Sequence, residues 1–126
     1  MKKPPILFSV LLFLAVSGCN KTAEIVAPVL EGQYAGTFER NGTIANVELN
    51  LSNLDFTGSS ETDKFPAICS GHYTATDDSI HFENTCIWTA EFDWTLILGE
   101  SWHYVLDNDK LTLTRSNGDR YDLQKQ

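Results

Sequence analysis

Residues 32–51 have the sequence GQYAGTFERNGTIANVELNL, and this stretch decides the fold class. Apolar side chains alternate with polar ones around a central Asn-Gly pair, with Tyr34 and Phe38 before it and Leu49 after it. A period of two residues is typical of a strand with one buried face. Asn41-Gly42 favours a two-residue hairpin turn because both residues tolerate a positive φ. The stretch therefore predicts a β-hairpin that packs one face into a core.

The same alternation continues to the C-terminus. Further short strands are expected over residues 56–60, 68–76, 79–84, 102–106, 111–115 and 121–123, joined by turns rich in Asp, Asn, Gly and Ser. Long helical patterns are missing, which excludes α/β folds built on a parallel sheet. We therefore predict an all-β fold, a small up-and-down antiparallel β-barrel of about eight strands with at most one short helix, because closure removes exposed strand edges. A two-sheet sandwich is the alternative.

Residues 88–98 fit two patterns. Their apolar and polar residues alternate as in a strand, yet Trp88 and Phe92 are also four residues apart, as neighbours on a helix are. We expect a short helical or irregular turn near residues 88–93, followed by a strand that begins at Trp94.

The hairpin around Asp77-Asp78 predicts a disulfide. If these two residues form the turn, Thr76 pairs with Ser79, and the same register places Cys69 directly opposite Cys86. Opposed residues that are not hydrogen-bonded have Cβ atoms close enough for a disulfide. Such a bridge stabilises a domain by about 3 kcal/mol in the chain-entropy model.

The N-terminus predicts export. Lys2 and Lys3 precede an apolar run from Ile6 to Val16, which is well short of the roughly 20 residues that span a bilayer. The run ends in Val16-Ser17-Gly18-Cys19, which resembles the bacterial lipobox. That resemblance implies that residues 1–18 are a lipoprotein signal peptide and that Cys19 carries diacylglycerol and acyl chains such as palmitate. Two or more such chains hold a protein stably on a membrane.

The mature chain divides into a tether and one domain. Residues 19–31 are expected to form the lipidated cysteine and the tether, and residues 32–126 the barrel domain. Asn20 follows the cysteine in place of Asp, which favours the outer membrane of the cell envelope by analogy with enterobacterial sorting. Loss of Lys2 and Lys3 changes the formal charge from −8 to −10. Nucleic acid is not an expected partner, because a uniformly acidic surface repels phosphates.

Motifs for catalysis or metal binding are weak. His72 would oppose Glu83 with His81 nearby, but a polar outer face is the simpler interpretation than a metal site. The sequence contains no Gly-x-Ser-x-Gly elbow and no Gly-rich phosphate loop. We expect no enzyme activity, no cofactor and no metal.

The aromatic residues leave two functions open. An eight-stranded barrel is either filled by side chains or holds one small ligand. A small apolar ligand at the open end would contact Phe38, Leu49, Phe82 and Trp102. The alternative is a protein-binding accessory or inhibitor lipoprotein with a solid barrel core, which would use loops near residues 58–64 and 88–93.

The motifs also resemble those of a known group. Gly32-x-Tyr34-x-Gly36-x-Phe38, Gly71-x-Tyr73, Phe92-x-Trp94-x-Leu96-x-Leu98-Gly99 and Leu111-x-Leu113 occur in this order. The pattern resembles small lipocalin-like lipoproteins of Bacteroidota and, more distantly, the calycins. Calycins open their first strand with Gly-x-Trp, and in lipocalins an Arg of the last strand covers that Trp. The resemblance implies that Tyr34 takes the Trp position and that Arg115 or Arg120 takes the Arg role.

Overall fold

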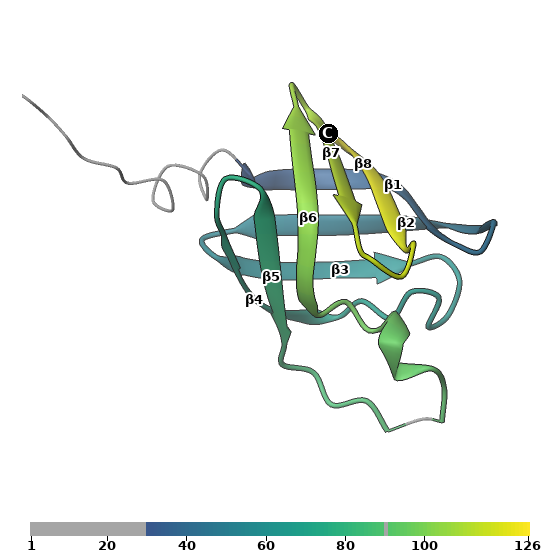
Figure 1. Cartoon of the computed structure of the whole chain (residues 1–126). Coiled ribbons are helices and arrows are strands. Elements are labelled where there is room, and N and C mark those ends of the chain that lie inside the picture. The colour runs from purple at the N-terminus through teal and green to yellow at the C-terminus, as the bar shows by residue number, and fades with distance from the viewer. Residues whose placement is uncertain (1–29, 90) are drawn as a thin grey trace, which may run out of the picture.

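The computed structural model describes residues 30–89 and 91–126. In this part the chain forms eight β-strands and one 3-10 helix (Figure 1). The elements in chain order are β1 (Gly32–Arg40), β2 (Thr43–Ser52), β3 (Asp55–Ser60), β4 (Ser70–Ala75), β5 (Ser79–Asn84), η1 (Trp94–Leu96), β6 (Glu100–Asp107), β7 (Lys110–Thr114) and β8 (Arg120–Lys125).

The strands form a closed up-and-down barrel, as the sequence predicts. Each strand pairs antiparallel with the next, and β8 returns to pair with β1 from Tyr34↔Lys125 to Glu39↔Arg120. The β1–β2 turn is the expected one, since Asn41 and Gly42 both have positive φ. Closure pairs the first strand with the last, so neither remains an exposed edge.

The hairpin register and the disulfide are confirmed. Strands β4 and β5 pair from Gly71↔Asn84 to Ala75↔Ile80, which is the register that follows from a turn at Asp77-Asp78. Cys69 and Cys86 lie two residues beyond the Gly71↔Asn84 pair and form a disulfide with a Cα–Cα distance of 6.2 Å.

The expected strand from Trp94 is wrong. Residues Trp94–Leu96 form the 3-10 helix η1, which Asp93 caps by accepting a hydrogen bond from the Thr95 backbone N–H at 3.0 Å. The chain then crosses one end of the barrel, where the Leu98 N–H donates to the Ala67 carbonyl at 2.9 Å. The next strand, β6, begins only at Glu100. The alternating pattern fails here because Trp94 is exposed to solvent rather than packed on a sheet face.

Aromatic rings pack across the barrel interior. The Phe38 and Trp102 rings lie against Tyr121 with centroid distances of 4.9 and 5.1 Å, and Phe56 contacts Phe82 at 5.2 Å. All five side chains are at most 3% exposed.

Two glycines allow neighbouring strands to approach closely. A Cβ on Gly36 would lie 1.9 Å from the Asp122 carbonyl oxygen, and a Cβ on Gly71 would lie 1.9 Å from that of Glu83. Glycine within a strand commonly marks such a close approach or a bend in a barrel. The glycines of Gly36-x-Phe38 and Gly71-x-Tyr73 therefore have a steric role in forming this barrel.

The contacts of the barrel begin two residues before β1. Leu30 is fully buried in the core, and its carbonyl accepts a hydrogen bond from the Tyr34 hydroxyl at 2.8 Å. Glu31 accepts a hydrogen bond from the Asn53 backbone N–H at 2.8 Å. Leu30 and Glu31, which the sequence analysis assigns to the tether, thus contact the folded domain.

Candidate functional site: the loop end of the barrel

The two ends of the barrel differ in their connections. The start of β1 lies at the same end as the short turns that follow β2, β4 and β6. The opposite end, here called the loop end, carries the connections at residues 41–42, 61–69, 85–99 and 115–119 (Figure 1). The long connection between β5 and β6, described over residues 85–89 and 91–99, is here called the aromatic loop. It lies away from the point where the chain enters β1.

The base of the aromatic loop is held by covalent and polar contacts. Cys86 is joined to Cys69, and its backbone N–H and carbonyl both bond the Asn84 side chain, at 3.3 and 2.9 Å. The Trp88 indole N–H donates to the Asn84 side-chain oxygen at 3.4 Å. Residues 86 and 88 are therefore both fixed, with Ile87 between them.

The loop presents apolar side chains to solvent. Ring contacts join Trp88 to Phe92 at 5.7 Å and Phe92 to Trp94 at 6.2 Å, and the Lys64 ammonium lies 5.9 Å from the Phe92 centroid. Ile87 is 87% exposed and Trp94 is 56% exposed. Exposed apolar groups that lie close together are typical of surfaces that bind other molecules.

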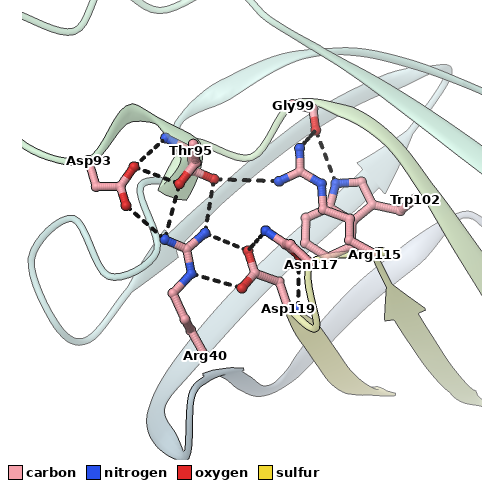
Figure 2. Close-up of polar contacts among 8 residues, drawn as sticks. All are labelled: Arg40, Asp93, Thr95, Gly99, Trp102, Arg115, Asn117 and Asp119. Atoms are coloured by element: carbon pink, nitrogen blue, oxygen red, sulfur yellow. Dashed lines mark hydrogen bonds and ion pairs between the residues drawn. The ribbon is translucent and has the colours of Figure 1, made fainter.

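A buried ion pair between Arg40 and Asp119 connects two segments of the loop end near η1 (Figure 2). The Arg40 guanidinium donates to both carboxylate oxygens of Asp119, at 2.8 and 2.6 Å, and Asp119 is 2% exposed. The Asn117 side chain donates to the same carboxylate at 3.1 Å. This arrangement joins the end of β1 to the turn between β7 and β8.

Arg40 also binds the aromatic loop. Its Nη1 donates to the Asp93 carboxylate and to the Thr95 hydroxyl, both at 3.0 Å. Asp93 in turn accepts hydrogen bonds from the Thr95 backbone N–H at 3.0 Å and from its hydroxyl at 2.6 Å. A single guanidinium thus connects β1, the β7–β8 turn and η1.

A second arginine closes the barrel over Trp102 (Figure 2). The Arg115 guanidinium carbon lies 4.5 Å from the Trp102 ring centroid. Its N–H groups donate to the carbonyls of Thr95 at 3.4 Å and Gly99 at 3.3 Å, and the Trp102 indole N–H donates to Gly99 at 3.0 Å. Arg115 therefore holds both ends of the segment 95–99.

Hydrogen bonds, together with the charge of Arg40, lower the pKa values of both carboxyls. Burial by itself would raise the pKa of Asp119, but hydrogen bonds from Arg40 and Asn117 outweigh burial and hold that pKa below its ordinary value. The hydrogen bonds from Thr95, with the charge of Arg40, also lower the pKa of Asp93. The hydrogen bond to Asp119 raises the pKa of Arg40. All three groups are charged at neutral pH.

The residues expected to line a ligand cavity lie inside the barrel. They are at most 3% exposed and belong to the packed core: Phe38, Leu49, Phe82 and Trp102. Their side chains occupy interior space that a ligand would need.

The expected arginine partner of Tyr34 is wrong. Arg115 covers Trp102 instead, and Arg120 binds the carboxylate of Asp122 with N–O distances of 2.8 and 3.0 Å. The ammonium of Lys125, on the last strand, lies 5.7 Å from the Tyr34 ring centroid. The difference follows from position, because Tyr34 lies near the start of β1 whereas Arg115 and Arg120 flank a turn at the loop end.

The histidine cluster does not assemble into a metal site within the described residues. His72 lies opposite Glu83, as expected, but its ring bonds the Asp55 carboxylate at 2.7 Å, and the His81 ring bonds the Ser101 hydroxyl at 2.9 Å. Across residues 30–89 and 91–126, no group of three His, Cys, Asp or Glu side chains is arranged to hold a metal ion.

The predicted lipidation site lies outside the described residues. Residues 1–29 include Cys19 and the whole predicted signal peptide. Among the residues that the structure describes, no helix has the length and apolar character to cross a membrane.

Sequence reasoning missed the roles of Arg40, Asp93 and Asp119. Arg40 ends a strand and Asp119 follows a turn Gly, and 79 positions separate them in the chain. Nothing in the local pattern pairs them. The sequence indicates only that Arg40 lies at one end of the barrel, because it directly precedes the Asn-Gly turn of the first hairpin.

Comparisons with known proteins identify no relative of this chain. No family model matches the chain, and neither a curated protein nor a solved structure matches it.

Proposed function

We propose that this chain is a lipocalin-like bacterial lipoprotein of the outer membrane that binds a protein partner with the loop end of its barrel. The observation that carries the proposal is the aromatic loop, which exposes Ile87 and Trp94 on a backbone fixed by the disulfide and by Arg40. A pre-organised loop binds with a smaller loss of conformational entropy. Apolar anchors on such a loop commonly supply most of the binding energy of an interface.

The packed interior supports a solid scaffold. Rings of β1 and β6 pack on the Tyr121 ring of β8, and a ring of β3 packs on one of β5. A solid barrel is a rigid support for loops, which is what a protein-binding module needs.

The position of the domain's N-terminal end is consistent with a lipid-anchored protein. The sequence predicts a lipid at Cys19, and the chain enters β1 at the end opposite the aromatic loop. A protein held by that lipid would direct its loop end away from the membrane surface, toward a partner.

Site-specific crosslinking in the bacterium that makes the chain tests this function. A photo-crosslinking amino acid at position 87 should give a defined protein adduct, whereas the same group at Val105 should not. Val105 is the matched control because it is 52% exposed on β6, near the barrel end opposite the loop end. Equal adducts at both positions, or none at position 87, would refute the loop end as the contact surface.

The lipid anchor needs its own test. Metabolic labelling with an alkyne analogue of palmitate should mark the full chain, and Cys19→Ala should abolish the label. Labelling that survives Cys19→Ala would refute this anchor.

A small apolar ligand is the second candidate function, and one observation favours it. The Tyr73 hydroxyl is buried in the core without a hydrogen-bond partner among the described residues. Burial raises the pKa of Tyr73 to about 12, so the hydroxyl remains a neutral donor. A ligand with one polar atom would satisfy it, although an ordered water would do the same. Native mass spectrometry of residues 20–126 separates the two functions, since a retained apolar molecule would add mass that denaturation removes.

A further inference from the structure

A groove opens on the barrel surface where β6 separates from β5. The two strands pair only from Ser79↔His103 to Phe82↔Glu100, and the chain before Glu100 turns away to the aromatic loop. The groove has a volume of about 740 Å³, and its lining includes His81, Glu83, Asn84, Trp94, Glu100 and Arg115. That volume suits a side chain or a small molecule.

The lining of the groove carries more negative than positive charge. The side chains of Glu83 and Glu100 are exposed, and neither carboxylate forms a hydrogen bond or ion pair in the part of the chain that the structure describes. Arg115 is the one cation in the lining, and its donors are directed to the carbonyls of Thr95 and Gly99. The His81 ring bonds the Ser101 hydroxyl. The lining therefore has two carboxylates, neither of them directly paired, against one guanidinium, a formal charge of −1.

Trp94 supplies an aromatic surface in the same groove. Its side chain is 56% exposed, and the ring lies 6.2 Å from that of Phe92. An indole ring attracts cations more strongly than other aromatic side chains do. Carboxylates beside an exposed indole are complementary to a cation that is also planar.

Glu100 occupies its position at a conformational cost. Its φ is +64°, in the left-handed region that residues with a Cβ seldom adopt, and glycine would tolerate this φ more easily. Strained residues of this kind cluster at binding sites.

We infer that this groove binds a guanidinium group, supplied by an exposed arginine of the protein partner. This inference rests on the proposed function, and it specifies the chemistry of the partner surface. Arginine fits better than lysine because its planar guanidinium stacks on an indole and donates two parallel hydrogen bonds to a carboxylate. A neutral sugar would leave both carboxylates without a counter-charge.

A titration monitored by NMR tests the groove with a defined probe. Isotope-labelled residues 20–126 are titrated with N-acetyl-arginine amide, and the Trp94 indole N–H and the Glu100 amide should shift most. Saturation is expected in the millimolar range, and added salt should weaken binding. N-acetyl-lysine amide should bind less tightly. No shift with the arginine probe would overturn the inference, and so would a stronger response to methyl glucoside, which would indicate a sugar site.

Variants locate the binding within the groove. Glu83→Gln and Trp94→Ala should each weaken arginine-amide binding by roughly two- to fivefold, the range expected for one exposed ion pair or cation–π contact. Glu48→Gln is the matched control, because Glu48 is exposed on β2 outside this groove. Equal losses in all three variants would show a non-specific charge effect and overturn the site.

Glu100→Gly distinguishes a binding role of Glu100 from a purely structural one, because stability and binding should change in opposite directions. The variant should resist urea better than the natural chain, because glycine relieves the positive φ, and it should bind the arginine amide less tightly. If the variant bound the arginine amide as tightly as the natural chain, Glu100 would not contribute to binding.

The result also separates this inference from the proposed function. A protein adduct at position 87 without arginine-amide binding would leave the loop-end function standing and overturn only the groove. An NMR shift of the Trp94 indole N–H with arginine amide, without a protein adduct at position 87, would support guanidinium binding in the groove and refute the protein partner.

Discussion

Replacing Asp119 with asparagine should destabilise the barrel by about 2–3 kcal/mol at pH 7, a large share of the roughly 5–15 kcal/mol typical of a domain. The change removes one negative charge and keeps the shape of the side chain. It leaves the Arg40 guanidinium, which is mostly buried, facing a neutral amide.

The magnitude follows from the contacts that are lost. Arg40 donates two charge-assisted hydrogen bonds to Asp119, at 2.8 and 2.6 Å. Each such bond contributes about 1.5–3 kcal/mol, and loss of one partner of a buried pair costs about 3–5 kcal/mol. Arg40 keeps its contact with the exposed Asp93, and asparagine retains one acceptor oxygen, so the expected loss lies below that range.

Urea denaturation of residues 20–126 measures the effect. With a slope near 1.5 kcal/mol per M, the midpoint should fall by about 1.3–2 M. Asp122→Asn is the matched control, because Asp122 also binds an arginine through two N–O contacts, at 2.8 and 3.0 Å. That pair is exposed, with side chains 48% and 33% accessible, so its loss should cost less than about 1 kcal/mol.

The pH dependence gives a second check. The pKa of Asp119 is lowered in the folded barrel, so its stabilisation is complete above the unfolded value of about 3.9 and is lost as the pH falls through the lower folded value. The difference between the natural chain and Asp119→Asn should therefore be constant from pH 7 to about pH 5 and shrink below about pH 4. Equal losses for Asp119→Asn and Asp122→Asn, or a difference that persists at pH 2, would refute the reasoning.

Three further predictions concern the barrel itself, each measured by urea denaturation. Replacing Cys69 and Cys86 together with serine should lower the free energy of unfolding by about 3 kcal/mol, and an unchanged midpoint would contradict the loop-entropy estimate. Gly71→Ala should destabilise by roughly 2 kcal/mol or more, because the new Cβ would lie 1.9 Å from the Glu83 carbonyl oxygen; a neutral effect would mean that the strands separate at little cost. Tyr73→Phe should be neutral or stabilising by up to about 1 kcal/mol, since it removes a buried hydroxyl without a partner, and a clear loss would reveal a bound water or ligand.

Much of the fold was predictable because its signals are local. Alternation marks strand faces, and Asn41-Gly42 and Asp77-Asp78 mark hairpin turns, so the register of β4 and β5 follows by counting from the turn. The disulfide follows from the same register. Closure was predictable because a set of short antiparallel strands leaves two edges unless the first pairs with the last.

The loop end was not predictable in the same way. Trp94 continues an alternating pattern, yet it lies in a 3-10 helix, because Asp93 caps that turn and the chain there pairs with Ala67 instead of a strand. An alternating segment becomes a strand only if a neighbouring strand has free backbone groups opposite it.

The sequence by itself determined the strands, the hairpin registers and the cysteine pairing, since each depends on the side-chain period or on residues linked through one turn. Only the tertiary structure decided that the interior is packed with rings and that Arg40 binds both Asp119 and Asp93. It also decided that β6 leaves β5 beside Trp94 and so opens the groove. These features join segments far apart in the chain. They depend on which side chains pack together and which charged groups pair when the barrel closes.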